Sequence, residues 1–138
     1  MRRTRNDILQ LMKERILILD GATGTYLQQL KLTEEDFRGT LFGDHPVPLK
    51  GCNDVLCLTK PKAIIAMHRA YIEAGADIIE TNSFNCNCFS LADYGLEDRV
   101  YEISKAAAEC ARRAAPLPLP SPEGEGVVTF EGKILSST

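Results

Sequence analysis

The stretch Ile16-Leu17-Ile18-Leu19-Asp20-Gly21-Ala22-Thr23-Gly24-Thr25 decides the fold of this chain. Its four consecutive aliphatic residues predict a short, fully buried β-strand that ends at Asp20. Two glycines follow, which allow a tight turn and expose backbone N–H groups at the start of the next helix. A strand, a turn and a helix in this order indicate an α/β fold, in which functional residues gather at the carboxyl ends of the strands.

The same corner carries groups suited to two opposite charges. The carboxylate of Asp20 suits a cation, and the backbone amides of Gly21, Ala22, Thr23 and Gly24 suit a small anion. We therefore expect a zwitterionic ligand such as an amino acid here, and the alternative is that Asp20 only caps the helix. Phosphate sites fit poorly, because the turn has neither the G-x-G-x-x-G spacing nor the Lys-Ser/Thr ending of a P-loop.

A second helix and strand follow the same plan. Thr59-Lys60-Pro61 begins a helix with apolar residues at helical spacing, and Gly75 ends it. The segment 77–82 then predicts a second buried strand, which again ends in an acid and polar residues, Glu80, Thr81 and Asn82. A helix between two strands is half of a βαβ unit, so we expect the two strands to be parallel.

The remaining elements are predicted from periodicity and punctuation. Helices are expected over residues 7–13, 25–30, 89–93 and 96–115. Residues 33–58 are expected to form a long, irregular loop, and loops of this length are usually functional or disordered. At Pro116 the composition changes to a Pro-rich run followed by Glu-Gly-Glu-Gly, which is typical of a linker. The predicted domains are therefore 1–115 and a foreign-looking tail over 116–138, with one strand or a small hairpin at 127–135.

Composition excludes several classes of protein. The 138 residues are 44% hydrophobic and 25% charged, as in an ordinary globular domain. A net charge of −3 and a pI near 5.4 argue against nucleic-acid binding. Because no apolar run approaches a membrane span or a signal peptide, we expect a cytoplasmic protein without a membrane partner. Its five cysteines are expected to be free thiols.

Five motifs in order resemble the amino-terminal part of the homocysteine-binding domain of cobalamin-dependent methionine synthase. The resemblance covers about residues 8–115, and each motif alone is weak, whereas their order and spacing are specific. The matching motifs are Leu19-Asp20-Gly21-Ala22-Thr23-Gly24-Thr25, Phe37-Arg38-Gly39, Leu49-Lys50-Gly51-Cys52-Asn53-Asp54-Val55-Leu56, residues 68–85, and Ala92-Asp93-Tyr94-Gly95-Leu96.

The resemblance implies an incomplete (β/α)₈ TIM barrel, of which this chain supplies about the first two strands and their helices. It implies methyl transfer to the sulfur of homocysteine to give methionine, with methylcobalamin or 5-methyltetrahydrofolate as the methyl donor. Zinc and cobalamin are cofactors of the full-length family, and the zinc cysteines lie on later strands. We therefore expect a truncated or split copy that alone binds neither group and is inactive. Its expected partners are homocysteine, the rest of the barrel, and the cobalamin and folate domains.

The resemblance also implies a set of substrate-binding residues. Asp20 would lie near the substrate ammonium group, and the turn from Gly21 to Gly24 would hold the carboxylate on backbone amides. Glu80, Thr81 and Asn82 would face the same mouth, together with Asn53 from the long loop. For Glu80 the alternative is a solvated or ion-paired acid, and no catalytic residue is predicted.

Two questions stay open at the level of sequence. Cys86 and Cys88 are spaced so that one metal could take both from a strand, but the spacing of the other cysteines fits no standard zinc site. The alternatives to an enzyme fragment are a non-catalytic remnant, whose bare sheet edge would pair with another barrel fragment or itself, and a small amino-acid-binding module.

Overall fold

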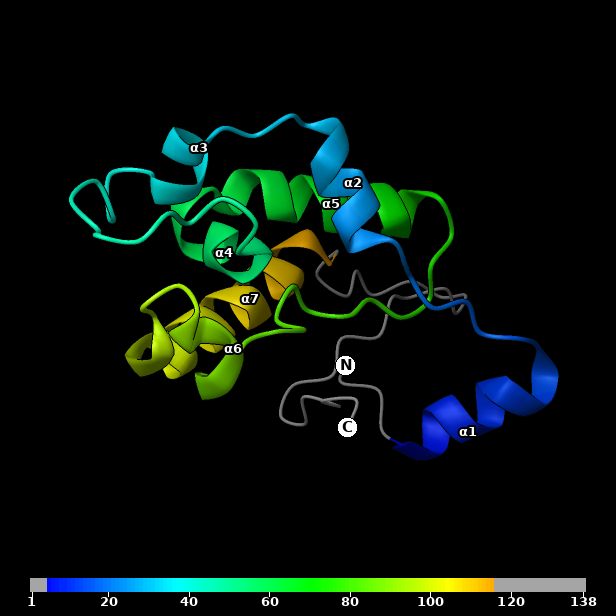
Figure 1. Ribbon diagram of the computed structural model, residues 1–138. Coiled ribbons are helices and arrows are strands. Elements are labelled where there is room, and N and C mark those ends of the chain that lie inside the picture. Colours follow the sequence, from blue (N-terminus) through cyan, green and yellow to red (C-terminus); the bar gives the residue numbers. More distant parts are fainter. Residues whose placement is uncertain (1–4, 116–138) are drawn as a thin grey trace.

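The computed structural model describes residues 5–115, so the predicted domain 116–138 and its strand or hairpin lie outside the described residues. Within this range the chain is mainly helical (Figure 1). In chain order the elements are α1 (Arg5–Glu14), α2 (Thr23–Gln29), α3 (Glu34–Arg38), η1 (Asn53–Val55), α4 (Leu56–Thr59), α5 (Pro61–Glu73), α6 (Cys88–Ala92), η2 (Glu97–Arg99) and α7 (Val100–Ala114).

The core lies between α5 and α7, with α4 packed beside them (Figure 1). Ile64 and Met67 on α5 and Ile103 on α7 are completely buried. Burying an aliphatic side chain of this size contributes about 1.5–3 kcal/mol to stability. Pro61 fits the first turn of α5, where its missing N–H has no helical partner, and the positive φ of Gly75 follows the end of this helix. The predicted helix before Gly75 is confirmed.

Helix α7 presents one apolar face to this core. Ile103, Ala107, Cys110 and Ala114 recur at helical spacing and are buried. The sequence pattern predicted Val100, Ile103, Ala107 and Cys110 on this side, and Val100 is only half-buried. The small Ala and Cys side chains allow α7 to pack closely against α5. The start of the predicted helix is a separate turn, η2, so the α-helix proper begins at Val100 rather than Leu96.

The predicted parallel strands are reduced to a single bridge. Leu19 pairs with Ile78 in parallel orientation, and the described residues contain no longer strand. The Asp20 N–H donates to the Ile78 carbonyl at 2.9 Å, and the Asp77 N–H donates to the Ile18 carbonyl at 2.8 Å. The parallel direction is confirmed, whereas the predicted strands at 16–19 and 77–82 were wrong in length.

The prediction that residues 16–19 are fully buried was also wrong. The exposed fractions are 83% for Ile16, 53% for Ile18 and 51% for Leu19. The physical reason is that a parallel strand becomes buried only when other strands lie on both edges and helices cover both faces. Here the only strand-like partner of this segment is residues 77–80, and the backbone groups of Leu17 and Leu19 on the other edge have no partner in the described part of the chain.

A salt bridge stabilises the pairing of the two segments that contain Leu19 and Ile78. The guanidinium of Arg15 donates two hydrogen bonds to the carboxylate of Asp77, at 2.8 and 2.6 Å. The same carboxylate accepts the N–H of Ile18 at 2.9 Å. Asp77 therefore fixes the register between the two segments with its side chain and its backbone together.

The loop predicted over residues 33–58 contains short helices instead of being irregular throughout. Helix α3 begins with a capping box, in which the Thr33 hydroxyl accepts the N–H of Asp36 and the Asp36 carboxylate accepts the N–H of Thr33. Asp36 also forms a salt bridge with Lys60 at the start of α5. Later in the loop η1 and α4 follow without a break.

Between these helices, Arg38 organises the backbone of residues 42–47. Its guanidinium donates to four carbonyl oxygens, at distances of 2.6 to 3.3 Å, and to the carboxylate of Glu34 at 2.7 Å. The four carbonyls belong to Phe42, Gly43, His45 and Val47. Glu34 in turn accepts the N–H groups of Leu49 and Lys50 at 2.7 Å each. One ion pair thus fixes a loop with little regular structure of its own.

One buried polar side chain of the core, His68, bears on stability. His68 on α5 is completely buried, and neither of its ring nitrogens has a hydrogen-bond partner. Burial lowers the pKa of His68 to about 4.

Among the helices described here, none combines the length and the apolar character needed to cross a bilayer.

Candidate functional site

The structure brings Asp20 and Glu80 together at the ends of the bridged segments. The Glu80 N–H donates to Oδ1 of Asp20 at 3.1 Å. Burial raises the pKa of the Asp20 carboxyl, the hydrogen bond from Glu80 opposes that rise, and the negative charge of Glu80 adds to it. Asp20 is half-buried and Glu80 is exposed, so the two carboxyl groups form an acidic corner that solvent or a ligand can reach.

The turn after Asp20 differs from the sequence prediction in the residue that bends the chain. Ala22 adopts the left-handed conformation, with φ 43° and ψ 39°, whereas the prediction gave the tight turn to the two glycines. Ala22 also precedes the first turn of α2 and offers its N–H groups no side-chain acceptor. A Cβ added at Gly21 or Gly24 would meet no atom within 4 Å, so open space lies beside both.

Asn82 and Asn53 are also brought together, but in a way that the sequence did not predict. The Asn82 side chain is buried and donates from Nδ2 to the carbonyl oxygen of Asn53 at 2.8 Å. The Cys57 thiol donates to the Asn82 carbonyl at 3.4 Å. The side-chain amide of Asn82 therefore connects the segment 77–82 to η1 and α4 and does not point toward solvent.

Two of the predicted site residues, Asp20 and Asn53, contact the segment 80–82. Glu80 contacts Asp20 on one side, and Asn82 contacts Asn53 on the other. Between them, the Thr81 hydroxyl makes a 2.7 Å hydrogen bond with the hydroxyl of Ser83. Asp20, Gly21, Gly24 and Glu80 form the open part of the predicted site, whereas the Asn82 side chain is buried.

Asp54 is a residue that the sequence analysis did not single out. Its side chain is only 4% exposed and its carboxylate accepts the N–H of Asn85 at 3.1 Å. Burial raises the pKa of Asp54, while hydrogen bonds from backbone N–H groups oppose the rise. The signal was an acid directly before the apolar run from Val55 to Leu58, since charged side chains are seldom buried without a specific partner.

The five cysteines do not form a zinc site. Each is a free thiol, and within residues 5–115 no three His, Cys, Asp or Glu side chains are close enough to hold a metal together. Cys86 hydrogen-bonds to Ser104 and to the Val100 carbonyl, whereas Cys88 is exposed at the start of α6. Burial raises the pKa of Cys52 to about 11, which disfavours the thiolate that zinc requires. The residues described here therefore do not fit zinc.

This arrangement is suited to binding a ligand that carries both a positive and a negative charge. An acidic corner at Asp20 attracts a cation, and the uncapped N–H groups of the adjacent turn attract an anion at short range. An amino acid carries both charges, an ammonium and a carboxylate, on neighbouring atoms.

One comparison with known proteins bears on this geometry. Residues 17–118 match the family model described as homocysteine S-methyltransferase. The match begins at the first residues of the aliphatic segment and includes the acidic corner, the Asn53–Asn82 contact and helices α2 to α7.

Proposed function

The chain belongs to the homocysteine S-methyltransferase family, and from this premise we propose that Asp20 and the turn after it bind the amino-acid end of homocysteine. In this proposal Asp20 contacts the ammonium group, and the backbone amides of Gly21, Ala22, Thr23 and Gly24 face the carboxylate. Glu80, Thr81, Asn82 and Asn53 complete the wall of the site. The observation that carries the proposal is the contact between Asp20 and Glu80 inside the matched residues.

The Asp20 carboxylate is suited to this role because only part of its hydrogen-bonding capacity is used. Oδ1 accepts the Glu80 N–H, and the rest of the carboxylate has no partner among the described residues. Glu80 adds a second negative charge close by, which favours a cation over a neutral group. A hydrogen bond between a carboxylate and an ammonium group is worth about 1.5–3 kcal/mol.

The family connects this site to methyl transfer onto the sulfur of homocysteine. We further propose that the product is methionine and that the methyl group comes from methylcobalamin or 5-methyltetrahydrofolate. The thiol must be activated for that reaction, and the described residues do not fit the zinc that the family uses for it. In this proposal the chain alone binds substrate without turning it over.

The exposed aliphatic segment supports a barrel as the architecture that completes the site. Ile16, Ile18 and Leu19 present apolar side chains, and the edge at Leu17 and Leu19 presents unpaired backbone groups in the described structure. Further parallel strands and their helices would cover these apolar side chains and pair these backbone groups. We therefore propose that the bridge between Leu19 and Ile78 is the first strand pair of a (β/α)₈ barrel.

The experiment that tests substrate binding is calorimetric titration of the full chain with L-homocysteine. We expect saturable binding that Asp20→Asn weakens about tenfold or more, because the charge-assisted hydrogen bond is lost. Asp44→Asn is the matched control, since Asp44 is exposed and lies outside the site. The analogue 4-mercaptobutanoate, which lacks the ammonium group, should bind the wild type and Asp20→Asn equally weakly. Equal affinity of all three proteins for homocysteine would contradict the role of Asp20.

A further inference from the structure

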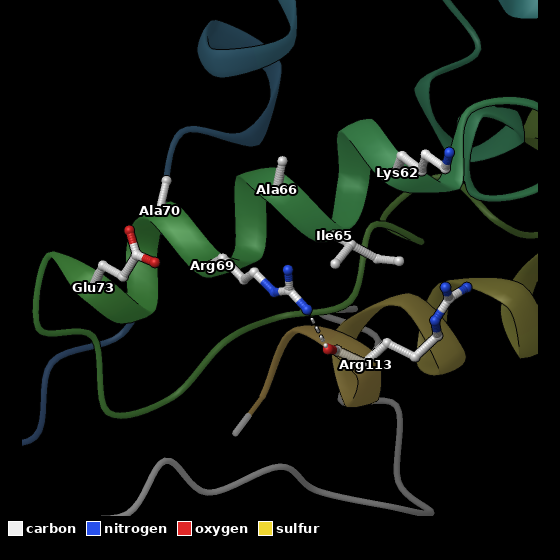
Figure 2. A pocket seen from close by; sticks show the side chains of 7 residues that line it. All are labelled: Lys62, Ile65, Ala66, Arg69, Ala70, Glu73 and Arg113. Atoms are coloured by element: carbon white, nitrogen blue, oxygen red, sulfur yellow. Dashed lines mark hydrogen bonds between the residues drawn. The ribbon is translucent and has the colours of Figure 1, made fainter. Parts of the chain in front are cut away.

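A groove between α5 and α7 carries charges that the proposed function does not use. It encloses about 520 Å³, which is within the usual range for sites of small molecules. Figure 2 shows its lining side chains, none of which belongs to the candidate site described above. These residues are Lys62, Ile65, Ala66, Arg69, Ala70, Glu73 and Arg113.

The register of α5 gives this groove its length. Lys62, Ala66, Arg69 and Glu73 are spaced three or four residues apart and therefore follow one face of the helix. At 1.5 Å per residue, this face extends about 16 Å along α5. Ile65, Ala66 and Ala70 supply an apolar floor between the charged side chains.

The charge along the groove is unbalanced. It has three cationic side chains and one carboxylate, in a chain whose net charge is −3. Arg15, Arg38, Lys60 and Arg99 each form a salt bridge, whereas Lys62, Arg69 and Arg113 have no carboxylate partner among residues 5–115. Lys62 also lies in the first turn of α5, where the helix dipole disfavours a positive charge. An anion in the groove would pair with these cations and would offset the unfavourable position of Lys62 at the start of α5.

Arg69 and Arg113 line the groove from two facing helices. Figure 2 shows the Arg69 side chain extending from α5 toward α7, where Nη2 donates to the backbone carbonyl of Arg113 at 3.4 Å. This contact uses one of the five N–H donors of the guanidinium and leaves the others available. A guanidinium binds phosphate or carboxylate with two parallel hydrogen bonds, and a second one from the facing helix would add to this contact.

We propose that the groove between α5 and α7 binds an organic anion. Its phosphate or carboxylate group contacts Arg69 and Arg113, and its apolar part lies on Ile65, Ala66 and Ala70. Glu73 sets one end of the site by repelling a second negative charge. This inference does not depend on the proposed function, since the two sites share no residue.

The test is titration of the full chain with phenyl phosphate, followed by calorimetry and by amide chemical shifts of α5 and α7. We expect saturable binding that the double variant Arg69→Gln/Arg113→Gln weakens about tenfold or more, because charge-assisted hydrogen bonds are lost. The control Lys13→Gln/Lys105→Gln removes the same charge from exposed positions outside the groove and should leave the affinity within about twofold. Inorganic phosphate should bind less tightly, since it lacks the apolar part.

Two further arms keep the result decisive. Glu73→Gln should raise the affinity for phenyl phosphate about two- to threefold, because it removes a repelling charge from an exposed position. Phenylacetate in place of phenyl phosphate distinguishes a carboxylate site from a phosphate site. The proposal is overturned if neither anion saturates the chain, if the control variant loses as much affinity as the arginine variant, or if Glu73→Gln weakens binding.

Discussion

The pair of helices α5 and α7 and the pair of segments at 16–20 and 77–82 use the same kind of residue with opposite results. Ile64 and Ile103 in the helices are completely buried, whereas Ile16 and Ile18 are mostly exposed. A helix satisfies its own backbone and needs one apolar partner face, but a parallel strand needs neighbours on both edges. The helical pair therefore buries its apolar faces within the described residues, whereas the strand pair leaves apolar side chains exposed and one edge unpaired there.

The largest expected effect compares one isoleucine from each pair. Ile64→Ala should lower the free energy of unfolding by about 2–5 kcal/mol, because it leaves a cavity in the core. Ile18→Ala should lower it by less than about 1 kcal/mol, because the side chain is already half in water. Urea unfolding of both variants measures this difference. Equal losses would mean that the segment 16–20 is as buried in solution as the helical core.

The next effect is the loss of stability at acid pH that comes from protonation of His68 on α5. Burial lowers the pKa of His68 to about 4, compared with about 6.5 in an unfolded chain. Between these values the unfolded chain binds the proton and the folded chain does not, so stability is present above pH 6.5 and is lost as the pH falls toward 4. The loss from His68 should be about 3 kcal/mol between pH 7 and pH 4.

A variant without this proton site isolates the contribution of His68. His68→Met keeps a buried side chain of similar size and titrates at neither pH. Urea unfolding at several pH values should therefore show a shallower acid loss for His68→Met than for the wild type. Carboxyl groups such as Glu34 and Asp36, whose pKa values are lowered, titrate alike in both proteins. Parallel pH profiles would show that His68 is protonated or hydrated in the folded chain.

The smallest effect compares the starts of two short helices. Thr33 caps α3 through the N–H of Asp36, whereas α2 begins at Thr23 without a side-chain cap. Thr33→Ala should therefore cost about 1 kcal/mol in thermal or urea unfolding, and Thr23→Ala should cost only a few tenths. A larger loss at Thr23 would indicate that its hydroxyl makes a contact in solution that α2 does not show here.

Periodicity predicted the helical part of the fold well, because helices depend on local signals. Pro61, Gly75 and the apolar face of α7 were sufficient to place α5 and α7 within a few residues. The direction of the pairing between Leu19 and Ile78 was also predictable from the order of helix and strand. The burial of residues 16–19 was not predictable, because it depends on strands and helices that the residues themselves do not specify.

The candidate site was predictable in position and less so in orientation. Asp20 and Glu80 meet where the ends of parallel segments were expected to meet. The inward direction of Asn82 depends on Cys57 and Asn53, which are 25 or more residues away, and no local pattern announces such a contact. Ala22 took the left-handed conformation although glycines stand on either side of the Ala22–Thr23 pair.

The hydrogen bonds of Arg38 have a consequence for how this chain tolerates change. Its guanidinium contacts carbonyl oxygens, which every amino acid carries, so this part of the loop's path does not depend on which side chains stand at the exposed positions. Exposed positions such as Leu41, Asp44 and Pro46 are therefore open to substitution by almost any residue. As long as Arg38 and its partner Glu34 are kept, the exposed positions of the loop can be substituted without loss of these hydrogen bonds.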